Sequence, residues 1–575
     1  MNPKAPDTTD SPAQDNVNPN IEMRNEKTQS ATVDKSDGAP AGSDEKSENE
    51  MEYPPLRIVA LLMAALYLAM FLVALDRIII STAIPKITDE FKSIDDVGWY
   101  GSAYVLAGCV TQLPFGRLYL FYNNKLVFLA AIVIFEVGSA LCGAAPNSIA
   151  FIIGRALAGV GSSGVFSGVI VIMIPVTPLE KRPMYQGLLG AIFGVSSVVG
   201  PLVGGAFTTS YLTWRWCFYI NLPIGAVSML IVVFFLHLSP PQQAALNFQQ
   251  KFIRMDLIGN LLFLPSIISL LLALQWGGTT FAWNNVRIIV LFILFGVLLV
   301  CWVVTQVRGN ENATVPPRIF QQRTIISGFC FSACIGGVML SMSYYLSIWF
   351  QAIDGVDALQ SGIRNLAFIL ALIVSSILAG IFVSKVGYYS PCVIVCSILM
   401  SIGTGLLTTL RVDSGSTEWI GYQVIAGLGM GFGMQQSGLA AQVVLKAEDV
   451  PIGASLMFFG QQLGGSIFIC VAETVFLHQQ ESNLQKVIPA DTAAQLVGIG
   501  ATELRSVVPP GLLQQVLGAY NESIDHTFYV GMSVACVSII PALLFEWKSV
   551  KGHERTHDNE IAENGTKAVF GKTRR

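Results

Sequence analysis

Four ionisable residues stand inside long apolar stretches of the sequence: Asp76, Glu136, Arg155 and Glu473. A charge buried in hydrocarbon costs about 2.5–3.5 kcal/mol or more, so residues of this kind are candidates for function. Asp76 lies near one end of the first apolar stretch and Arg155 about one turn into the fourth, which predicts similar depths. If the pair faces a central cavity, a proton on Asp76 would release Arg155, and the pair would act as a proton-coupling element. The alternative is a structural or helix-capping role for Asp76 at the membrane surface.

Glu136 and Glu473 have no obvious cationic partner within their own apolar stretches. Each carboxyl group could carry a proton or meet a cationic substrate. For Glu136, a protonated and hydrogen-bonded structural role is an equal alternative. For Glu473, we expect a position at the cavity, because its stretch is the repeat partner of a glycine-rich stretch described below.

Amide and aromatic side chains within the apolar stretches predict a cavity that suits amphiphilic organic molecules better than ions or sugars. The residues expected to line it are Gln112, Asn221, Tyr344, Tyr345, Trp349, Gln351, Gln435, Gln461 and Gln462. For Trp349, a place in an interfacial aromatic belt is the alternative interpretation.

The composition places these residues in a polytopic membrane protein. Hydrophobic residues make up 53% of the 575 residues and charged residues only 13%, with a mean hydropathy of +0.58. Apolar runs recur at the length that a bilayer demands. We expect fourteen membrane-spanning helices in groups of six, two and six. They lie at about 58–80, 97–119, 126–145, 150–174, 187–207, 217–238, 255–275, 287–306, 325–350, 362–385, 391–410, 419–442, 453–477 and 527–547.

The polar ends and loops divide the chain further. Residues 1–56 are predicted to be a disordered cytoplasmic tail, because their composition cannot form a core and lacks a signal-peptide apolar region. Lysine and arginine in the short loops place both tails in the cytosol. The predicted parts are a six-helix half at 57–240, an insert at 241–320, a second half at 321–548 with an outer loop at 478–526, and a tail at 549–575. The sequon at Asn521 falls outside, where a glycan could be attached.

The stretch from Gly187 to Gly205 carries small residues at alternating steps of three and four. This spacing puts them on one helix face, where another backbone can approach closely. We expect a helix that packs tightly and bends against a neighbour, serving as a hinge and a seal. The residues assigned to this packing and gating role are Gly187, Gly194, Gly200, Pro201, Gly204 and Gly205.

The two halves look like copies of one another. Gly116 matches Gly380, Gly159 matches Gly427, and Gly187 with Gly194 matches Gly453 with Gly460, at offsets of 264, 268 and 266 residues. Parallel repeats of this kind build one class of secondary transporter, with the substrate site between the halves.

Several other functions are disfavoured by the sequence. There is no P-loop, HExxH or GxSxG pattern, and the GxGxxG match at 159–164 lies within an apolar stretch without a preceding strand. We therefore expect no enzyme activity, no cofactor and no metal. The ten cysteines are interpreted as small hydrophobic residues, and the net charge of −4 gives no reason to expect nucleic acid as a partner.

Several motifs resemble those of the major facilitator superfamily, specifically its 14-span drug:proton antiporters. They are Leu75-Asp76-Arg77-Ile78-Ile79 with Ala83-Ile84-Pro85, Gly116-Arg117-Leu118 with Lys125, Arg155 with Gly159-Val160-Gly161, and Gly200-Pro201-Leu202-Val203-Gly204-Gly205. The segment 214–223 and the late segments 500–505 and 519–521 are similar to fungal toxin and multidrug efflux pumps of the aflatoxin-efflux type.

The resemblance implies an all-α fold of two six-helix halves plus two inserted helices, and proton-coupled efflux of hydrophobic small molecules by alternating access. It also implies a monomer in the plasma membrane, with vacuolar or vesicle membranes as alternatives, and the proton gradient as the energy source. Arg117 and Lys125, beside Gly116, are expected to hold the cytoplasmic gate. The family usually has an acidic residue where this chain has Leu120 and a glycine where it has Asn123, so the family's charge relay does not carry over. A nutrient facilitator or importer and a non-transporting receptor are the alternative functions.

Overall fold

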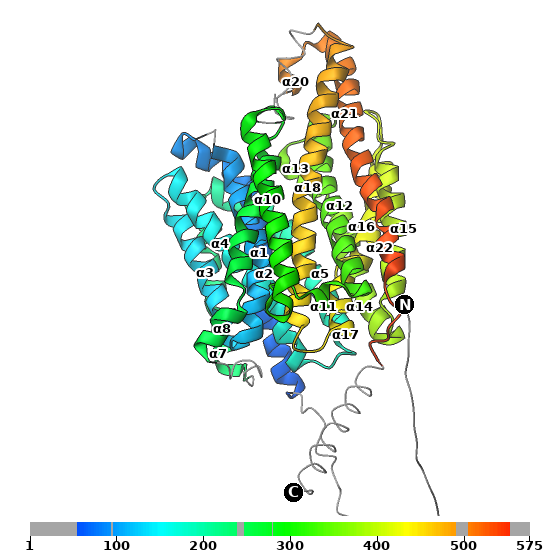
Figure 1. The fold of residues 1–575 in the computed structure, drawn as a ribbon. Coiled ribbons are helices and arrows are strands. Elements are labelled where there is room, and N and C mark those ends of the chain that lie inside the picture. Colours follow the sequence, from blue (N-terminus) through cyan, green and yellow to red (C-terminus); the bar gives the residue numbers. More distant parts are fainter. Residues whose placement is uncertain (1–53, 94–95, 238–246, 279, 490–503, 552–575) are drawn as a thin grey trace, which may run out of the picture. The chain divides into compact units, whose positions relative to one another are not determined.

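The helices of this protein follow from its apolar stretches, because a backbone in lipid must satisfy its own hydrogen bonds. The computed structural model describes residues 54–93, 96–237, 247–278, 280–489 and 504–551 (Figure 1). Within these ranges the regular structure is helical, apart from the single bridges Gly277–Phe281 and Tyr388–Ser549. Nearly all of both predicted tails lies outside the described residues.

The first half of the bundle contains five long helices and a shorter broken one. Asn123 and Asn147 accept hydrogen bonds from backbone N–H groups at the starts of the third and fourth helices, and so fix where these begin. The elements are α1 (Leu56–Phe91), α2 (Val97–Phe121), α3 (Asn124–Ala144), α4 (Ser148–Val176), α5 (Arg182–Thr209), α6 (Trp216–Tyr219) and α7 (Asn221–Phe235).

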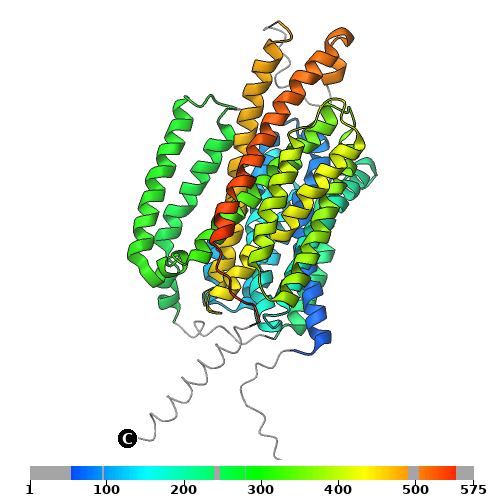
Figure 2. The same ribbon diagram turned by 90° about the vertical axis from the view of Figure 1, so that its right-hand side faces the viewer.

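Two long helices and three short ones make up the region of the predicted insert. They are α8 (Phe248–Arg254), α9 (Leu257–Trp276), α10 (Val286–Gly309), the 3-10 turn η3 (Asn310–Asn312) and α11 (Pro317–Phe320). Helices α9 and α10 pack on each other, and α9 also contacts α2 and α18. They are the green pair at the left of Figure 2. Only 6% of the residues in the apolar window of α10 are buried, so the rest of the protein leaves most of the surface of this helix uncovered.

The second half repeats the arrangement of the first with longer helices at its end. Its elements are α12 (Arg323–Ala352), α13 (Ala358–Arg364), α14 (Leu366–Val386), α15 (Ser390–Leu407), α16 (Ser416–Gly433), α17 (Gln436–Val444), α18 (Val450–Gln485), α20 (Leu504–Val507), α21 (Pro510–Val537) and α22 (Ile539–Leu544). Helices α18 and α21 extend beyond their neighbours at the top of both views (Figures 1 and 2). Much of the predicted outer loop at 478–526 is therefore helical rather than irregular.

Twelve helices of the described residues are long and apolar enough to cross a membrane. The two predicted spans outside this group are 97–119, which forms α2, and 419–442, which is divided between α16 and α17. The polytopic all-α fold is confirmed, whereas the count of fourteen is not.

Glycine contacts show that the two halves are built alike. A side chain added at Gly138 would collide with the backbone of Ala158, and one at Gly403 with that of Ala426. These pairs join α3 to α4 and α15 to α16, at offsets of 265 and 268 residues. The predicted internal repeat is thus present as repeated packing. The boundaries of the halves and of the insert, near 240 and 320, stay a prediction.

The halves meet mainly through α2 with α18 and α5 with α14. A side chain at Gly116 would collide with Ser455 at the start of α18, and one at Gly380 with Pro183 at the start of α5. We call the end of the bundle at which α5 and α18 begin the lower end, as it is drawn in Figure 1. At this end the two halves are in close contact.

The small residues of α5 contact two different helices. Gly187, Gly190 and Gly194 face α14, and the Ser376 hydroxyl there donates a 3.0 Å hydrogen bond to the Gly187 carbonyl. Beyond them, Gly200 and Gly204 face α1 within the same half. Helix α5 therefore joins the seal between halves to the helix that carries Asp76. An added Cβ at Gly205 would meet no heavy atom within 4 Å, so the structure gives this residue no part in the close contact.

Candidate functional site

Asp76 and Arg155 form an ion pair in the interior of the first half. Arg155 Nη1 lies 2.5 Å from Asp76 Oδ2, and the side chains of Arg155 and Asp76 are 1% and 0% exposed. Asp76 comes from α1 and Arg155 from α4, and the predicted equal depth of the two residues is what allows them to meet. A pair removed from water in this way is held strongly only if its other hydrogen-bonding atoms also have partners.

Those partners come from α2, α3 and the start of α7. The Asn221 amide donates at 3.1 Å both to Asp76 Oδ1 and to the Ser139 hydroxyl. Arg155 Nε donates to the Tyr100 carbonyl at 3.0 Å, and its guanidinium lies 4.5 Å from the centre of the Tyr104 ring. Asn221 thus belongs to the ion-pair cluster rather than to the cavity lining, which corrects the prediction made for it.

Glu136 is buried close to this cluster but does not join it. Its side chain is 6% exposed, and neither carboxyl oxygen has a hydrogen-bond partner among the described residues. The carboxyl group lies directly against the backbone of Gly225 in α7, where any side chain would displace it. The absence of a partner argues against the structural hydrogen-bonding role considered for Glu136.

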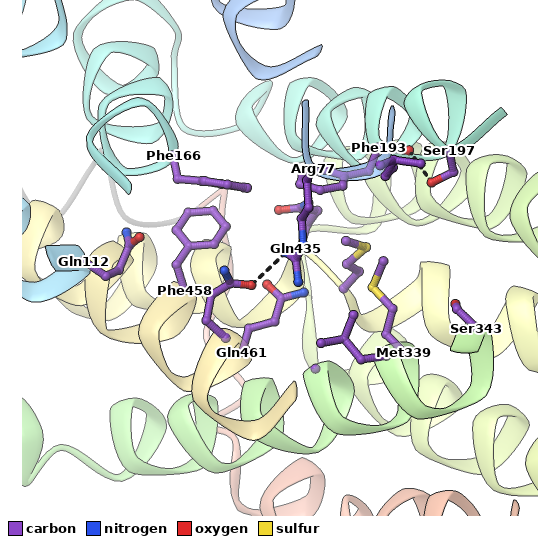
Figure 3. Close-up of a pocket in the computed structure, with 15 residues that line it drawn as sticks. Arg77, Gln112, Phe166, Phe193, Ser197, Met339, Ser343, Gln435, Phe458 and Gln461 are labelled. Atoms are coloured by element: carbon purple, nitrogen blue, oxygen red, sulfur yellow. Dashed lines mark hydrogen bonds between the residues drawn. The ribbon is translucent and has the colours of Figure 1, made fainter. Parts of the chain in front are cut away.

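A pocket lies between the two halves, with a volume of about 170 Å³. Its lining comes from α1, α2, α4, α5, α12, the junction of α16 with α17, and α18 (Figure 3). The lining residues are Arg77, Ile78, Gln112, Phe166, Phe193, Ser197, Gly336, Met339, Leu340, Ser343, Met434, Gln435, Phe458, Gln461 and Gln462. Its volume is below the roughly 300–1,000 Å³ of pockets that hold drug-sized ligands, so a larger molecule requires the halves to move apart.

Four of the glutamines predicted to line a cavity do so: Gln112, Gln435, Gln461 and Gln462. The Gln112 amide also donates to the Ser167 hydroxyl at 2.7 Å. An amide within an apolar span is therefore a useful signal, because a buried polar group needs either a partner or a wet cavity.

The pocket also contains residues that sequence reasoning missed. Arg77 lines it, and Arg77 Nη1 donates to Gln462 Oε1 at 3.0 Å across the two halves (dashed line in Figure 3). Phe166, Phe193 and Phe458 form an aromatic group beside it. The sequence did contain a signal for Arg77, because it directly follows Asp76. Consecutive helix residues point in different directions, so if Asp76 faces the interior of one half, Arg77 faces another surface of the helix.

The five remaining candidates lie outside the pocket lining. Trp349 and Tyr345 are buried in the core of the second half, where the Trp349 indole donates to Asn521 and the Tyr345 ring packs on Phe476. The others are Tyr344, which is 51% exposed, Gln351, whose amide donates to the Ser347 carbonyl, and Glu473, which is half-buried near Tyr344 and Tyr345. Trp349 and Tyr345 are thus core rather than cavity, whereas the cavity position expected for Glu473 stays a prediction.

Asn521 lies within α21 and is 7% exposed. Its amide nitrogen, the atom to which a glycan is joined, donates to the Leu410 carbonyl and to Asp525 Oδ2, both at 2.9 Å. Its oxygen accepts from Trp349 at 2.7 Å. A glycan on this folded chain has no room, so the expected glycosylation of Asn521 is a mistake caused by placing the last helix too late in the chain.

At the lower end, Arg117 and Lys125 donate hydrogen bonds to backbone carbonyls and do not form a charge relay with acidic side chains among the described residues. Arg117 is 1% exposed and donates to the carbonyls of Thr314 and Glu311, in the segment that follows α10. Lys125 Nζ donates to the carbonyls of Val233 and Leu236 at the end of α7. Both residues therefore stabilise junctions between helices, as the loss of the family's acidic residue at Leu120 requires.

A group of charges at the same end surrounds the segment bound by Arg117. Arg318 pairs with Glu311 at 3.0 Å and with Asp449, the residue before α18, at 2.8 Å. The hydrogen bond from Arg318 lowers the pKa of Glu311. Asp256, before α9, accepts bonds from Gln306, Thr314 and the Gly259 N–H. Burial opposes its charge, but these bonds outweigh burial and lower the pKa of Asp256.

Two sets of helices with a repeated packing arrangement, and a pocket between them, are the architecture on which one class of secondary transporter is built. Residues 66–469 match the Major Facilitator Superfamily, and the chain belongs to this family. It is 50% identical over 496 residues to the MFS-type efflux pump MFS1 of Arthroderma benhamiae, covering 86% of this chain and 92% of that protein. It is 48% identical over 514 residues to the rubrofusarin-specific efflux pump aurT of Gibberella zeae, covering 88% and 93%.

A solved structure shows the same fold at low identity. The bacterial homologue of the human lysosomal transporter Spinster, in an inward-facing and unoccupied conformation, aligns with a TM-score of 0.53 and 14% identity. The alignment covers 86% of this chain and all of that one. At this identity the likeness shows the fold alone.

Proposed function

We propose that this protein exports hydrophobic small molecules, such as a fungal secondary metabolite, toxin or drug, in exchange for protons. The observation that carries the proposal is the place of α1. One turn of this helix holds the buried Asp76–Arg155 pair on one side and Arg77, at the pocket, on the other. The names of the relatives, which are efflux pumps, support the direction of transport.

Proton coupling in this proposal begins with Asp76. A proton on its carboxyl group removes the charge that holds Arg155 and weakens the bond from Asn221. The turn of α1 that carries Asp76 and Arg77 is then free to shift. Because Arg77 reaches Gln462 on α18, such a shift changes a contact between the two halves. Glu136, buried and without a partner in the described structure, is the second proton carrier in this proposal.

The proposed topology keeps fourteen spans. We count α2 and the α16–α17 pair as the two further spans, because they pack against the long helices α4, α14 and α15. We place the cytosol at the lower end, because the short loops there carry a modest excess of lysines and arginines, and the even number of spans then returns both tails to the cytosol. We propose a monomer in the plasma membrane that uses the proton gradient and no cofactor.

Transport by purified protein in liposomes tests the proposal. With a pH gradient imposed, wild type should concentrate an exported compound, and an uncoupler should abolish the gradient-driven part. Asp76→Asn leaves Arg155 buried without its counter-charge, which typically costs about 3–5 kcal/mol, so folding must be checked by thermal unfolding. The double variant Asp76→Asn with Arg155→Gln removes both charges. It should fold and catalyse exchange of substrate without concentrating it.

Glu90→Gln provides the matched control, because Glu90 pairs with Arg215 in the same half but is 45% exposed. Such exposed pairs contribute little, so this variant should keep gradient-driven transport. Concentrative transport by the double variant at the wild-type rate would contradict the coupling role. Binding without any exchange would point to a receptor, and accumulation of substrate by intact cells would point to an importer.

A further inference from the structure

The pocket contains one formal charge that no other described residue neutralises. Of the fifteen residues that line it, Arg77 alone is charged, and no carboxylate is among them. The adjacent Asp76 is occupied by Arg155 and Asn221, within the first half. Among the described contacts, Arg77 makes no ion pair, and its side chain bonds only to the neutral amide oxygen of Gln462. A guanidinium has five N–H donors, and the described hydrogen bonds use one of them.

The surroundings of Arg77 favour a flat aromatic ligand. The Phe166 ring stacks on Phe193 with centroids 5.6 Å apart, and the tilted Phe458 ring has its centroid 5.2 Å from that of Phe166. Met339 and Met434 add polarisable, adaptable surface. Figure 3 shows Arg77 pointing into the space between Phe166 with Phe458 on one side and Met339 on the other.

We propose that the pocket takes aromatic molecules with one negatively charged group, and that Arg77 binds this group. The anion replaces the neutral oxygen of Gln462 as the acceptor, and a guanidinium can bind a carboxylate through two parallel hydrogen bonds between opposite charges, which a single amide oxygen cannot offer. The amides of Gln461 and Gln462 can then turn their N–H groups toward the same anion. The proposal rests on the proposed export function only in treating the bound molecule as cargo.

Binding measured without a proton gradient tests this charge preference separately from transport. The probes are radiolabelled 2-naphthoate, which is ionised at neutral pH, and its uncharged methyl ester, bound to purified protein in phosphatidylcholine nanodiscs. The quantity compared between variants is the ratio of the dissociation constants of the acid and the ester. Partition of the ester into lipid affects every variant equally, so it cancels in this comparison. In Arg77→Gln the dissociation constant of the acid should rise by about tenfold or more relative to that of the ester, while ester binding changes little.

A second variant keeps the test decisive if Arg77→Gln folds poorly. Gln462→Glu nearly keeps the size of the side chain and puts a carboxylate where Arg77 now binds an amide oxygen. This carboxylate competes with the acid for Arg77, so acid binding should weaken although the arginine is still present. Arg287→Gln, at an exposed position at the start of α10, is the charge-matched control and should leave the ratio unchanged.

The outcomes separate the two proposals. A ratio unchanged in both Arg77→Gln and Gln462→Glu, or equal loss of acid and ester in both, would overturn the anion preference even if efflux is proton-coupled. A shifted ratio in a protein that shows no gradient-driven transport would support the anion site and refute the export function.

Discussion

Asp76 and Arg77 are neighbours in sequence with opposite surroundings. Asp76 is buried within one half and paired, whereas Arg77 lines the space between halves and has no charged partner among the described residues. The reason is helical geometry, because each residue turns about 100° from the one before it. In the proposed mechanism, the residue that takes up a proton on one side of α1 and the residue that binds the ligand on the other are thus joined by a single peptide unit.

At Glu136, function and stability are expected to oppose each other. Its carboxyl group is buried without a hydrogen-bond partner in the described structure, which costs free energy of folding. Glu136→Met, an apolar residue of similar volume, should therefore raise the melting temperature of the purified protein. The same variant should lower gradient-driven transport about tenfold or more while leaving substrate exchange intact. A lower melting temperature would instead show that Glu136 has a structural role.

The polar residues of the site were partly predictable from the sequence. Asp76, Arg155 and four glutamines stand out because charges and amides are rare in apolar spans, and the similar depth of Asp76 and Arg155 is what allows these two to meet. Trp349 and Tyr345 were misplaced, because an aromatic residue suits both a core and a cavity and its helix face depends on tertiary packing. Arg77 was missed because a charge near the end of an apolar run looks like a loop residue.

Helix α5 presents neighbouring glycines that face different surroundings, which allows a matched comparison. A Cβ at Gly204 would collide with Thr82 and Ile79 of α1, whereas one at Gly205 would meet no atom within 4 Å. Gly204→Ala should lower the melting temperature and reduce transport, because α5 and α1 must separate. Gly205→Ala should leave transport unchanged and stabilise α5 by up to about 1 kcal/mol through helix propensity. Equal effects of the two substitutions would refute the close packing of α5 on α1.

The segment between α10 and α12 is held by acidic groups whose charge depends on pH. The pKa of Asp256 is lowered in the folded protein, so its contribution to stability is present above about pH 4 and is lost as the pH falls through the folded pKa. Asp256→Asn should therefore melt at a lower temperature than wild type at pH 7. The difference should narrow below about pH 4. A difference that stays constant from pH 7 to pH 3 would contradict this role of the Asp256 charge.

Helix lengths at the end of the chain differ most from the sequence prediction. The spans at 453–477 and 527–547 were drawn from hydropathy alone, but α18 continues to Gln485 and α21 begins at Pro510. Hydropathy detects the part of a helix that contacts lipid and is silent on polar turns beyond it. The early start of α21 places Asn521 in a helix and makes its sequon inaccessible.

On the scale of the whole molecule, the two halves touch at the lower end through residues that can be cross-linked. Ser167 of α4 and Ser455 of α18 approach to 2.9 Å between their hydroxyl oxygens. The double variant Ser167→Cys with Ser455→Cys should form a disulfide under oxidation, since the two side chains point at one another and their hydroxyl oxygens are in contact. Oxidation should stop transport, and a reductant should restore it, because alternating access requires this contact to open.

The matching control joins two helices of the same half. Thr111 and Ser163 approach to 2.8 Å between hydroxyl oxygens of α2 and α4. A cysteine pair at these positions should cross-link without stopping transport, because the first half moves as one body. Undiminished transport by the oxidised Ser167–Ser455 pair would contradict movement at the lower end.

The closure at the lower end includes close contacts between residues with very short side chains, among them Gly116, Gly187, Gly380 and Ser376. Glycine has no rotamers to lose, so bringing these surfaces together orders few side chains and parting them releases few. These contacts therefore contribute little to the difference in conformational entropy between a closed and an open lower end. In the proposed transport cycle, the balance between the two states then depends more on terms that a proton and a bound molecule can change.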